Sequence, residues 1–212
     1  IERSFATEND VAGIDGKDTR VDVDVAVLDT GIDFEHPDLN VVGRTNCAPT
    51  KSEFTGCIDG AGTDGYGHGT HVAGTIGAID NGEGVVGVAP GARLWAVRVL
   101  NDQGSGAFSW IIAGIDWVTH TREDADPKND IEVANMSLGC SGGCFAAGMH
   151  EALAASVDKG VVYVVSAGNA AEDAQYTIPA SYPEAITVSA LSDTDGVPGG
   201  EGPKSCYDSF SG

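Results

Sequence analysis

Basic side chains are scarce in this chain of 212 residues. Lysine and arginine together number 11, against 32 aspartates and glutamates, which gives a formal charge of −21 at neutral pH. A polyanion of this size is a poor partner for nucleic acid or for an acidic membrane face, so we expect neither. The acids are scattered rather than gathered in runs, which favours a solvated surface over salt adaptation or general cation binding.

Long apolar runs are also missing. No segment reaches the roughly 18 apolar residues that a membrane-spanning helix needs. The first residues, Ile1 to Ser4, lack the apolar region of a signal peptide, so we expect a chain that is cytosolic or already processed. No internal repeat or linker divides the sequence. We therefore expect a single domain over residues 1–212, with residues 1–20 as a polar lead-in.

Cysteine is limited to five positions. Cys47 and Cys57 bracket one short stretch, and Cys140 and Cys144 bracket another. This spacing predicts two local disulfides, Cys47–Cys57 and Cys140–Cys144, and hence an oxidising compartment. A zinc site built from the same four cysteines is the alternative, although the spacings fit paired zinc knuckles poorly. Cys206 is then a free thiol, or its partner lies outside this chain.

The hydrophobic pattern predicts strands that alternate with helices. Strands are expected at 21–28, 92–100, 131–136, 161–165 and 185–191. Helices are expected from about 68 to about 80, from a cap at Ser109 to about 122, and at 145–159. Residues 40–65 are interpreted as loop-rich. The alternation indicates an α/β fold in three layers, with a largely parallel central sheet and helices on both faces.

Three polar side chains stand where these elements begin or end. Asp29 follows a buried strand, His68 lies between two glycines at a helix start, and Asn169 follows another buried strand. Hydrolysis of a peptide bond needs a base, a group that orients the base, and a donor for the oxyanion, and these residues suit those roles in the order His68, Asp29, Asn169. Each alone is more often a helix cap, a surface residue or a turn former. His71 raises a zinc-dependent hydrolase as another hypothesis, but its spacing of three from His68 favours a structural residue packed behind His68.

Six stretches together resemble the motifs of the subtilisin family (subtilases) of serine proteases. They are VAVLDTG at 25–31, GHGTHVAGT at 67–75, GVAP at 87–90, GSG at 104–106, NMSLG at 135–139 and SAGN at 166–169. The resemblance covers about residues 21–212. It implies that Asp29 and His68 are two of the three catalytic residues of a secreted serine endopeptidase, and that Asn169 is its oxyanion donor.

One motif of that family is not present. The family's nucleophile lies in a Gly-Thr-Ser-Met-Ala-x-Pro stretch, and the 212 residues contain none. We therefore expect the amino-terminal part of a catalytic domain, truncated at its carboxyl end, whose serine is supplied by sequence beyond this chain. A carboxyl-terminal fragment that carries the nucleophile is then a partner. The alternative is a catalytically dead, subtilase-like binding or scaffold module.

The same resemblance implies substrate contacts and a calcium site. Two segments would pair with an extended polypeptide substrate, an apolar subsite would hold its fourth residue before the cleaved bond, and further residues would border the pocket beside that bond. The two segments are Gly104, Ser105, Gly106 and Ser137, Leu138, Gly139; the subsite is Phe108, Ile111 and Leu138; the pocket border is Ser166, Ala167, Gly168 and Thr177. The calcium ligands would be side-chain oxygens of Asp38 and Asn81 and carbonyl groups of Ile79, Glu83 and Val85. An Asn-Gly turn that binds nothing is the alternative there.

Overall fold

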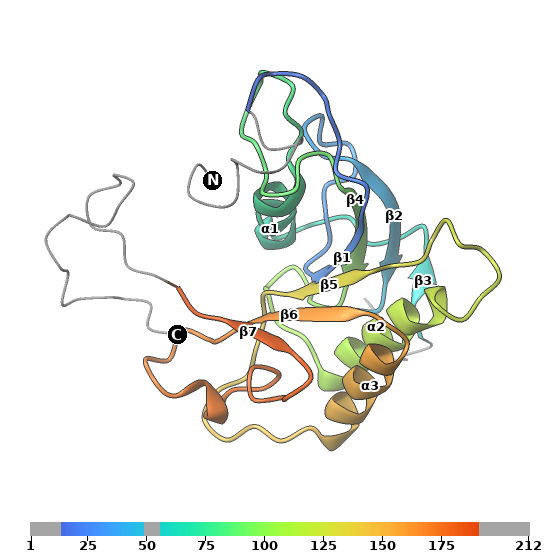
Figure 1. Ribbon diagram of the computed structural model, residues 1–212. Helices are drawn as coiled ribbons and strands as arrows, with labels where there is room; N and C mark the ends of the chain where they lie inside the picture. Colours follow the sequence, from blue (N-terminus) through green and yellow to red (C-terminus); the bar gives the residue numbers. More distant parts are fainter. Residues whose placement is uncertain (1–13, 49–55, 191–212) are drawn as a thin grey trace, which may run out of the picture.

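A seven-stranded sheet forms the centre of the molecule. The computed structural model describes residues 14–48 and 56–190. The strand order is β3-β2-β4-β1-β5-β6-β7, and all neighbours run parallel except the antiparallel pair β2 and β3 (Figure 1). The strands are β1 (Asp24–Asp29), β2 (Val41–Asn46), β3 (Ile58–Asp59), β4 (Arg93–Arg98), β5 (Val133–Met136), β6 (Val162–Ser166) and β7 (Ile186–Val188).

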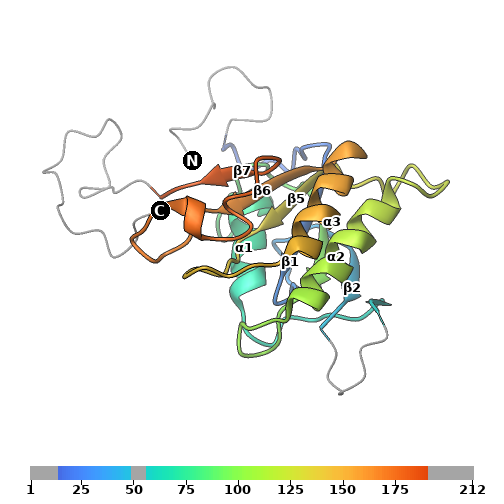
Figure 2. The same ribbon diagram turned by 90° about the horizontal axis from the view of Figure 1, so that it is seen from below.

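Strand β1 is buried on both faces because its alternate side chains enter two separate apolar clusters. Val25 and Val27 pack with Ala73 of α1 (His68–Gly77). Ala26 and Leu28 point the other way, into the larger cluster. Figure 2 shows α1 on one side of the sheet and two longer helices on the other. The expected three-layer α/β fold with helices on both faces is therefore confirmed.

The larger cluster lies under α2 (Phe108–Thr121) and α3 (Ala147–Asp158), which also pack against each other. Ile111, Ile115 and Val118 form the buried stripe of α2, and Met149 and Leu153 form that of α3. A short 3₁₀ helix, η1 (Ala174–Tyr176), precedes β7. Spacings of three and four residues place these side chains on one face of each helix, which explains why the sequence pattern located both helices.

The central position of β1 determines where a site can form. Its neighbours are β4 on one side and β5 on the other, so the chain changes sides of the sheet around this strand. In parallel α/β sheets, ligands bind in the crevice at the carboxyl ends of the strands next to such a change. Asp29 is the last residue of β1 and therefore lies at this crevice.

The prediction that residues 40–65 are loop-rich was wrong for two segments. β2 pairs with β4, and β3 pairs with β2. The pattern hides β2 because Thr45 is its one buried residue and a register irregularity lies between Val41 and Gly43. A side chain at Gly43 would overlap the ring of Trp95, so the glycine that weakens the strand pattern is required by packing.

Two predicted helix boundaries also differ from the structure. α2 begins at Phe108 after an extended Ala107, so Ser109 lies within the first turn and is not a cap. α1 ends at Gly77 instead of continuing to about residue 80. Beyond it, the Ile79 N–H donates to the Asp38 carbonyl, and the Asp80 carboxylate accepts the N–H groups of residues 15 and 16. These bonds to distant segments turn the chain out of the helix.

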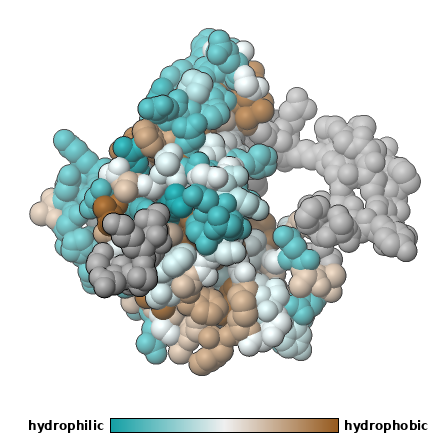
Figure 3. All heavy atoms as spheres, turned by 180° about the vertical axis from the view of Figure 1, so that it is seen from behind, coloured by the Kyte–Doolittle hydropathy of each residue, from teal (hydrophilic) through white to brown (hydrophobic). Residues whose placement is uncertain are grey.

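Both predicted disulfides are present, Cys47–Cys57 and Cys140–Cys144, which excludes a zinc site made from these four cysteines. Cys206 lies outside the described residues. The described part of the chain contains no helix long and apolar enough to cross a membrane. On the face opposite to that of Figure 1, hydrophilic residues dominate the upper half and apolar residues gather near the lower edge (Figure 3).

Candidate active site

His68 and Asp29 meet at the carboxyl end of β1. The His68 Nδ1 atom lies 2.8 Å from Asp29 Oδ1 and 2.9 Å from Oδ2. The Asp29 side chain is fully buried, whereas the His68 side chain is 44% exposed. Because Nδ1 is engaged with the carboxylate, the other ring nitrogen, Nε2, is free to exchange a proton on the open side of the ring. This is the geometry of a general base with an orienting carboxylate.

The environment of Asp29 sets its charge. Burial raises the pKa of Asp29 above its ordinary value, while the hydrogen bonds from His68 and from the Thr30 backbone act in the opposite direction. The Thr30 N–H donates to Asp29 Oδ1 over 2.7 Å. An imidazolium beside a buried carboxylate is stabilised more strongly than one in water, because the local dielectric constant is low.

Two glycines allow the close approach of β1 and α1. Gly67, the residue before the helix, has a φ of 98°, which is unfavourable for residues with a side chain. A Cβ atom at Gly69 would overlap the carbonyl oxygen of Gly31 and lie 3.1 Å from the Asp29 Cβ. The glycines on either side of His68 therefore bring the imidazole against the strand end.

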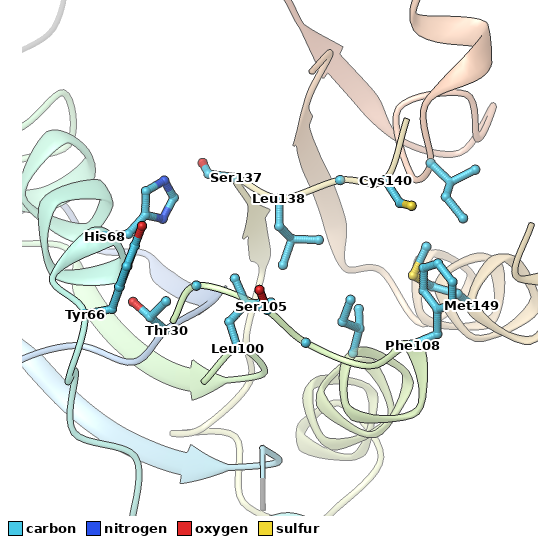
Figure 4. Close-up of a pocket in the computed structure, with 15 residues that line it drawn as sticks. Thr30, Tyr66, His68, Leu100, Ser105, Phe108, Ser137, Leu138, Cys140 and Met149 are labelled. Atoms are coloured by element: carbon cyan, nitrogen blue, oxygen red, sulfur yellow. The ribbon is translucent and has the colours of Figure 1, made fainter. Parts of the chain in front are cut away.

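A cleft of about 550 Å³ opens beside the exposed side of His68. In Figure 4, Tyr66 and His68 lie at one end of this cleft, and Phe108, Met149 and Cys140 lie at the other. Its two long walls are the segment that includes Ser105 and the segment from Ser137 to Cys140. All eight residues predicted for the two substrate edges and the apolar subsite line it: Gly104, Ser105, Gly106, Phe108, Ile111, Ser137, Leu138 and Gly139.

The other predicted pocket residues lie outside the cleft lining: Ser166, Ala167 and Gly168 at the end of β6, and Thr177 just after η1. A Cβ at Gly139 would lie 3.2 Å from Thr177, and one at Gly168 would lie 3.3 Å from it. Thr177 is buried, and its hydroxyl is hydrogen-bonded to that of Ser141 over 2.9 Å. Ser166 donates to the Leu138 carbonyl over 3.5 Å, and Ala167 is buried next to it. Ser166 and Thr177 therefore contact the 137–139 wall at Leu138 and Gly139, although they do not line the cleft themselves.

Asn169 is exposed in the turn that follows β6. Within the described residues its side chain makes no hydrogen bond, so its amide is available to a ligand. The turn starts at Gly168, whose φ is 101°. The cleft lining does not include Asn169, and the structure assigns its amide no partner among the described residues.

Several residues of the site escaped the sequence reasoning. Six further residues line the cleft: Thr30, Tyr66, Leu100, Cys140, Met149 and Ile178. Most of them are apolar side chains whose role depends on tertiary contacts, so no local signal identifies them. Asp64 is different, because an acid shortly before a helix start is a capping signal. It accepts hydrogen bonds from the N–H groups of Gly67 and Thr70.

Two of the predicted calcium ligands, Asn81 and Val85, contact the Asp38 carboxylate through N–H groups. Asn81 Nδ2 donates to Asp38 Oδ1 over 3.0 Å, and the Val85 N–H lies 3.5 Å from Oδ2. Gly84, with a φ of 60°, lets the loop close over the carboxylate, since a Cβ there would lie 2.7 Å from Oδ2. Within residues 14–48 and 56–190, no three His, Cys, Asp or Glu side chains cluster as metal ligands do. Any cation here would depend on carbonyl and amide oxygens.

His71 does not pack behind His68, so that expectation was wrong. Its side chain is exposed and lies along another cleft, whose lining includes Asp38 and Asp64. One helical turn separates the two histidines, and the Asp29 contact holds the imidazole of His68 toward the strand.

Comparison with known proteins agrees with the motifs. The model of the Subtilase family matches residues 21–208. Subtilisin E of Bacillus subtilis is 41% identical over 180 residues, and subtilisin of Bacillus pumilus is 42% identical over 176 residues. A cuticle-degrading protease of Metarhizium anisopliae is 43% identical over 171 residues. These matches cover 84%, 82% and 81% of this chain but 43%, 58% and 40% of the relatives, so the chain spans about half the length of the curated relatives it matches.

Proposed function

Because this chain belongs to the subtilase family, we propose that it is the part of a secreted serine endopeptidase that carries the catalytic histidine and aspartate. The observation that carries the proposal is the contact of 2.8 Å between His68 Nδ1 and the buried Asp29, at the edge of a cleft. Neither residue alone would support it, because each has an ordinary structural explanation. A buried carboxylate against a half-exposed imidazole has few other uses.

His68 acts as the general base in this proposal. Its Nε2 accepts the proton of the nucleophilic serine as the serine attacks the substrate carbonyl, and later returns that proton to the leaving amine. Asp29 accepts a hydrogen bond from the Nδ1–H group of His68, which fixes the tautomer and stabilises the imidazolium. Asn169 donates to the oxyanion, a role in which a subtilisin amide is worth about 10²–10³ in rate. The available amide of Asn169 supports this assignment.

The nucleophile is supplied by sequence beyond these 212 residues. None of the serines here lies in a Gly-Thr-Ser-Met-Ala-x-Pro context, and the matched relatives are about twice as long as the match. A carboxyl-terminal continuation or fragment would bring the serine to the open side of His68. The 212 residues alone are then one structural domain with a binding cleft but no turnover.

The substrate is a polypeptide bound as an extended strand. The segments 104–106 and 137–139 face each other across the cleft, as two edges that pair with a third strand would (Figure 4). Phe108, Ile111 and Leu138 give the cleft an apolar end away from His68, which suits the fourth residue before the cleaved bond. Ser166, Ala167, Gly168 and Thr177 would reach the substrate only beside the nucleophile.

Calcium is the proposed cofactor, bound at Asp38 and the loop 79–85. The donor set fits a hard cation: one carboxylate, one carboxamide, and the carbonyls of Ile79, Glu83 and Val85. Asp38 is buried, and its carboxylate contacts two of the other proposed ligand residues, Asn81 and Val85, which supports the grouping. Calcium would stabilise the folded enzyme. Secretion is supported by the two disulfides, which persist in oxidising compartments.

A fluorophosphonate probe tests the proposal directly, because it labels only an activated serine. Applied to the natural full-length protein, it should label a serine outside the 212 residues, and His68→Ala should abolish the labelling. An intact mass restricted to the 21.6 kDa of this chain, together with no labelling of the refolded material, would instead favour the inactive binding or scaffold module. The observation that favours the inactive module is that the 212 residues contain no nucleophile motif.

A further inference from the structure

A third carboxylate lies close to the His68–Asp29 pair and takes no part in the proton transfers described above. Asp64 precedes α1, and its two oxygens accept five hydrogen bonds. Oδ1 accepts from the Thr30 hydroxyl at 2.9 Å and from the N–H groups of Tyr66 at 3.0 Å and Gly67 at 2.8 Å. Oδ2 accepts from the Thr70 N–H at 3.0 Å and the Thr70 hydroxyl at 2.6 Å. A side chain with so many donors holds several segments at once.

The two hydroxyl groups extend this network to both partners of the pair. The Thr30 hydroxyl accepts the Gly69 N–H over 2.9 Å while it donates to Asp64. Thr30 follows Asp29 in sequence, and Gly69 follows His68. Because a hydroxyl has one proton, donation to Asp64 leaves its lone pairs for the N–H group. Asp64 therefore fixes the direction of the bond that joins the residue after the carboxylate to the residue after the imidazole.

The Thr70 hydroxyl makes the same kind of link on the outer side of the helix. It donates to Asp64 and accepts the Asp33 N–H over 2.9 Å. The first turn of α1 is thus tied to the loop after β1 on both of its sides. The register of strand against helix, which decides how far His68 lies from Asp29, rests on bonds that converge on one carboxylate.

The charge of Asp64 is secured by these bonds. Burial alone would raise the pKa of Asp64, but the hydrogen bonds from Thr70, Gly67 and Tyr66 outweigh burial and hold it below its ordinary value. The anion also lies at the amino-terminal end of α1, where the helix dipole is favourable to it. Asp64 stays an acceptor throughout the neutral pH range.

We propose that Asp64 is a positioning residue that sets the geometry of the His68–Asp29 pair through the hydroxyl groups of Thr30 and Thr70. The proposal rests on the proposed function, because it concerns the efficiency of the same base. Asp64 touches neither substrate nor nucleophile, so its loss should act on the chemical step and leave substrate binding almost unchanged. Loss of a group that orients a reacting side chain costs about 10–100-fold.

The test is Asp64→Asn in the natural full-length protein, with Asp33→Asn as the matched control. Asparagine keeps the shape of the side chain, but its NH2 group replaces one acceptor oxygen. That group would face hydrogen-bond donors that it cannot satisfy. Asp33 carries the same charge on the neighbouring loop after β1, yet its exposed carboxylate accepts only the Glu35 N–H among the described residues. We expect kcat to fall about 10–100-fold with KM within about twofold for Asp64→Asn, and both constants to stay unchanged for Asp33→Asn.

A spectroscopic measurement separates positioning from general stability. The Nδ1 proton of His68, shared with Asp29, gives a strongly deshielded proton resonance. We expect Asp64→Asn to shift or broaden this resonance at a temperature where circular dichroism shows a fully folded protein. An unchanged resonance together with an unchanged kcat would overturn the proposal.

A second pair of variants serves if Asp64→Asn does not fold. Thr70→Val removes one hydroxyl without changing the volume, and Thr70→Ser restores it. We expect a severalfold loss of kcat for valine and recovery for serine; equal activity of the two would also overturn the proposal. A wild-type protein that a fluorophosphonate does not label would refute only the proposed function, because the resonance of His68 needs no nucleophile.

Discussion

The two ends of helix α1 meet carboxylates in opposite ways. At its amino-terminal end, Asp64 accepts five hydrogen bonds, and Asp29 accepts from His68 and Thr30. Beyond its carboxyl-terminal end, Asp38 accepts one bond of 3.0 Å from the Asn81 carboxamide and one of 3.5 Å from the Val85 N–H. The Asp64 carboxylate at the first end therefore has many donors, whereas Asp38 has few.

This difference indicates what each end is suited to do. Donors hold anions in place and direct protons, so the amino-terminal end suits acid–base chemistry. A buried carboxylate with few donors keeps lone pairs for another ligand, so the other end is where we propose the hard cation. The helix dipole has the matching polarity at both ends, positive at the first and negative at the second. In the proposed function, one short helix would separate a catalytic region from a stabilising one.

Removal of the imidazole is the change with the largest expected effect. His68→Ala in the full-length protein should lower kcat/KM by about 10⁴–10⁶-fold, the range that single triad substitutions cost in a subtilisin. The physical reason is that the serine then has no base. The calcium-dependent thermal stability of the other end should be unaffected. His71→Ala, on the same helix but exposed, is the control and should keep its activity. A loss below tenfold for His68→Ala would remove the catalytic assignment.

Removal of calcium tests the proposed cation site at Asp38 and the loop 79–85. With free calcium at 100 times its dissociation constant, binding adds about 2.7 kcal/mol to the free energy of unfolding. For a protein of this size, Tm should then rise by roughly 5–10 °C over that in a chelator.

Asp38→Asn should abolish this difference because it deletes the only charged ligand. Glu83→Gln should retain it, since Glu83 contributes its backbone carbonyl. A wild-type Tm that ignores chelation in differential scanning calorimetry would contradict a calcium site here.

The pH dependence should separate the two carboxylates of the donor-rich end. Burial raises the pKa of Asp29, whereas hydrogen bonds hold the pKa of Asp64 below its ordinary value despite burial. Asp64 therefore contributes stability that is present above its unfolded pKa and is lost only as the pH falls through its depressed folded pKa. Asp29 has the opposite sign: its folded form binds the proton more tightly, so its protonation does not unfold the protein.

On acidification, kcat/KM should therefore fall first, about tenfold per pH unit below the apparent pKa of the catalytic pair. Far-UV circular dichroism should stay native over that range and change only at lower pH. The two curves are measured on one sample in the same buffers. Their coincidence would show that activity is lost through unfolding and not through Asp29.

Local patterns in the sequence predicted the framework of the site well. A continuous apolar run ending in Asp29 and a small-residue helix opening at His68 specify their own elements, so the strand end and the helix start were found. Strand β2 was not predicted, because its Gly43 is required by the ring of Trp95 on the neighbouring strand, a contact that no local pattern shows. The hydrogen-bond network of Asp64 was not predicted either, since it needs the hydroxyl of Thr30 to come within 2.9 Å across 34 residues of chain.

The smallest expected effect is the energetic coupling between the two ends. Asp64 accepts the Thr70 N–H in the first turn of α1, and the backbone carbonyl of Asp38 accepts the Ile79 N–H beyond its last turn. Because the two side chains share no hydrogen-bond partner in the described part of the chain, their contributions should be nearly independent. In a chelator, the urea-unfolding free energies of Asp64→Asn and Asp38→Asn should add within about 0.5 kcal/mol in the double variant. Asp64→Asn combined with Thr70→Val is the positive control, because those residues share a bond of 2.6 Å, and its coupling should be about 1 kcal/mol. A coupling of about that size between Asp64 and Asp38 would mean that α1 transmits the effect of one substitution to the other end. The division of the helix into a catalytic and a stabilising end would then fail.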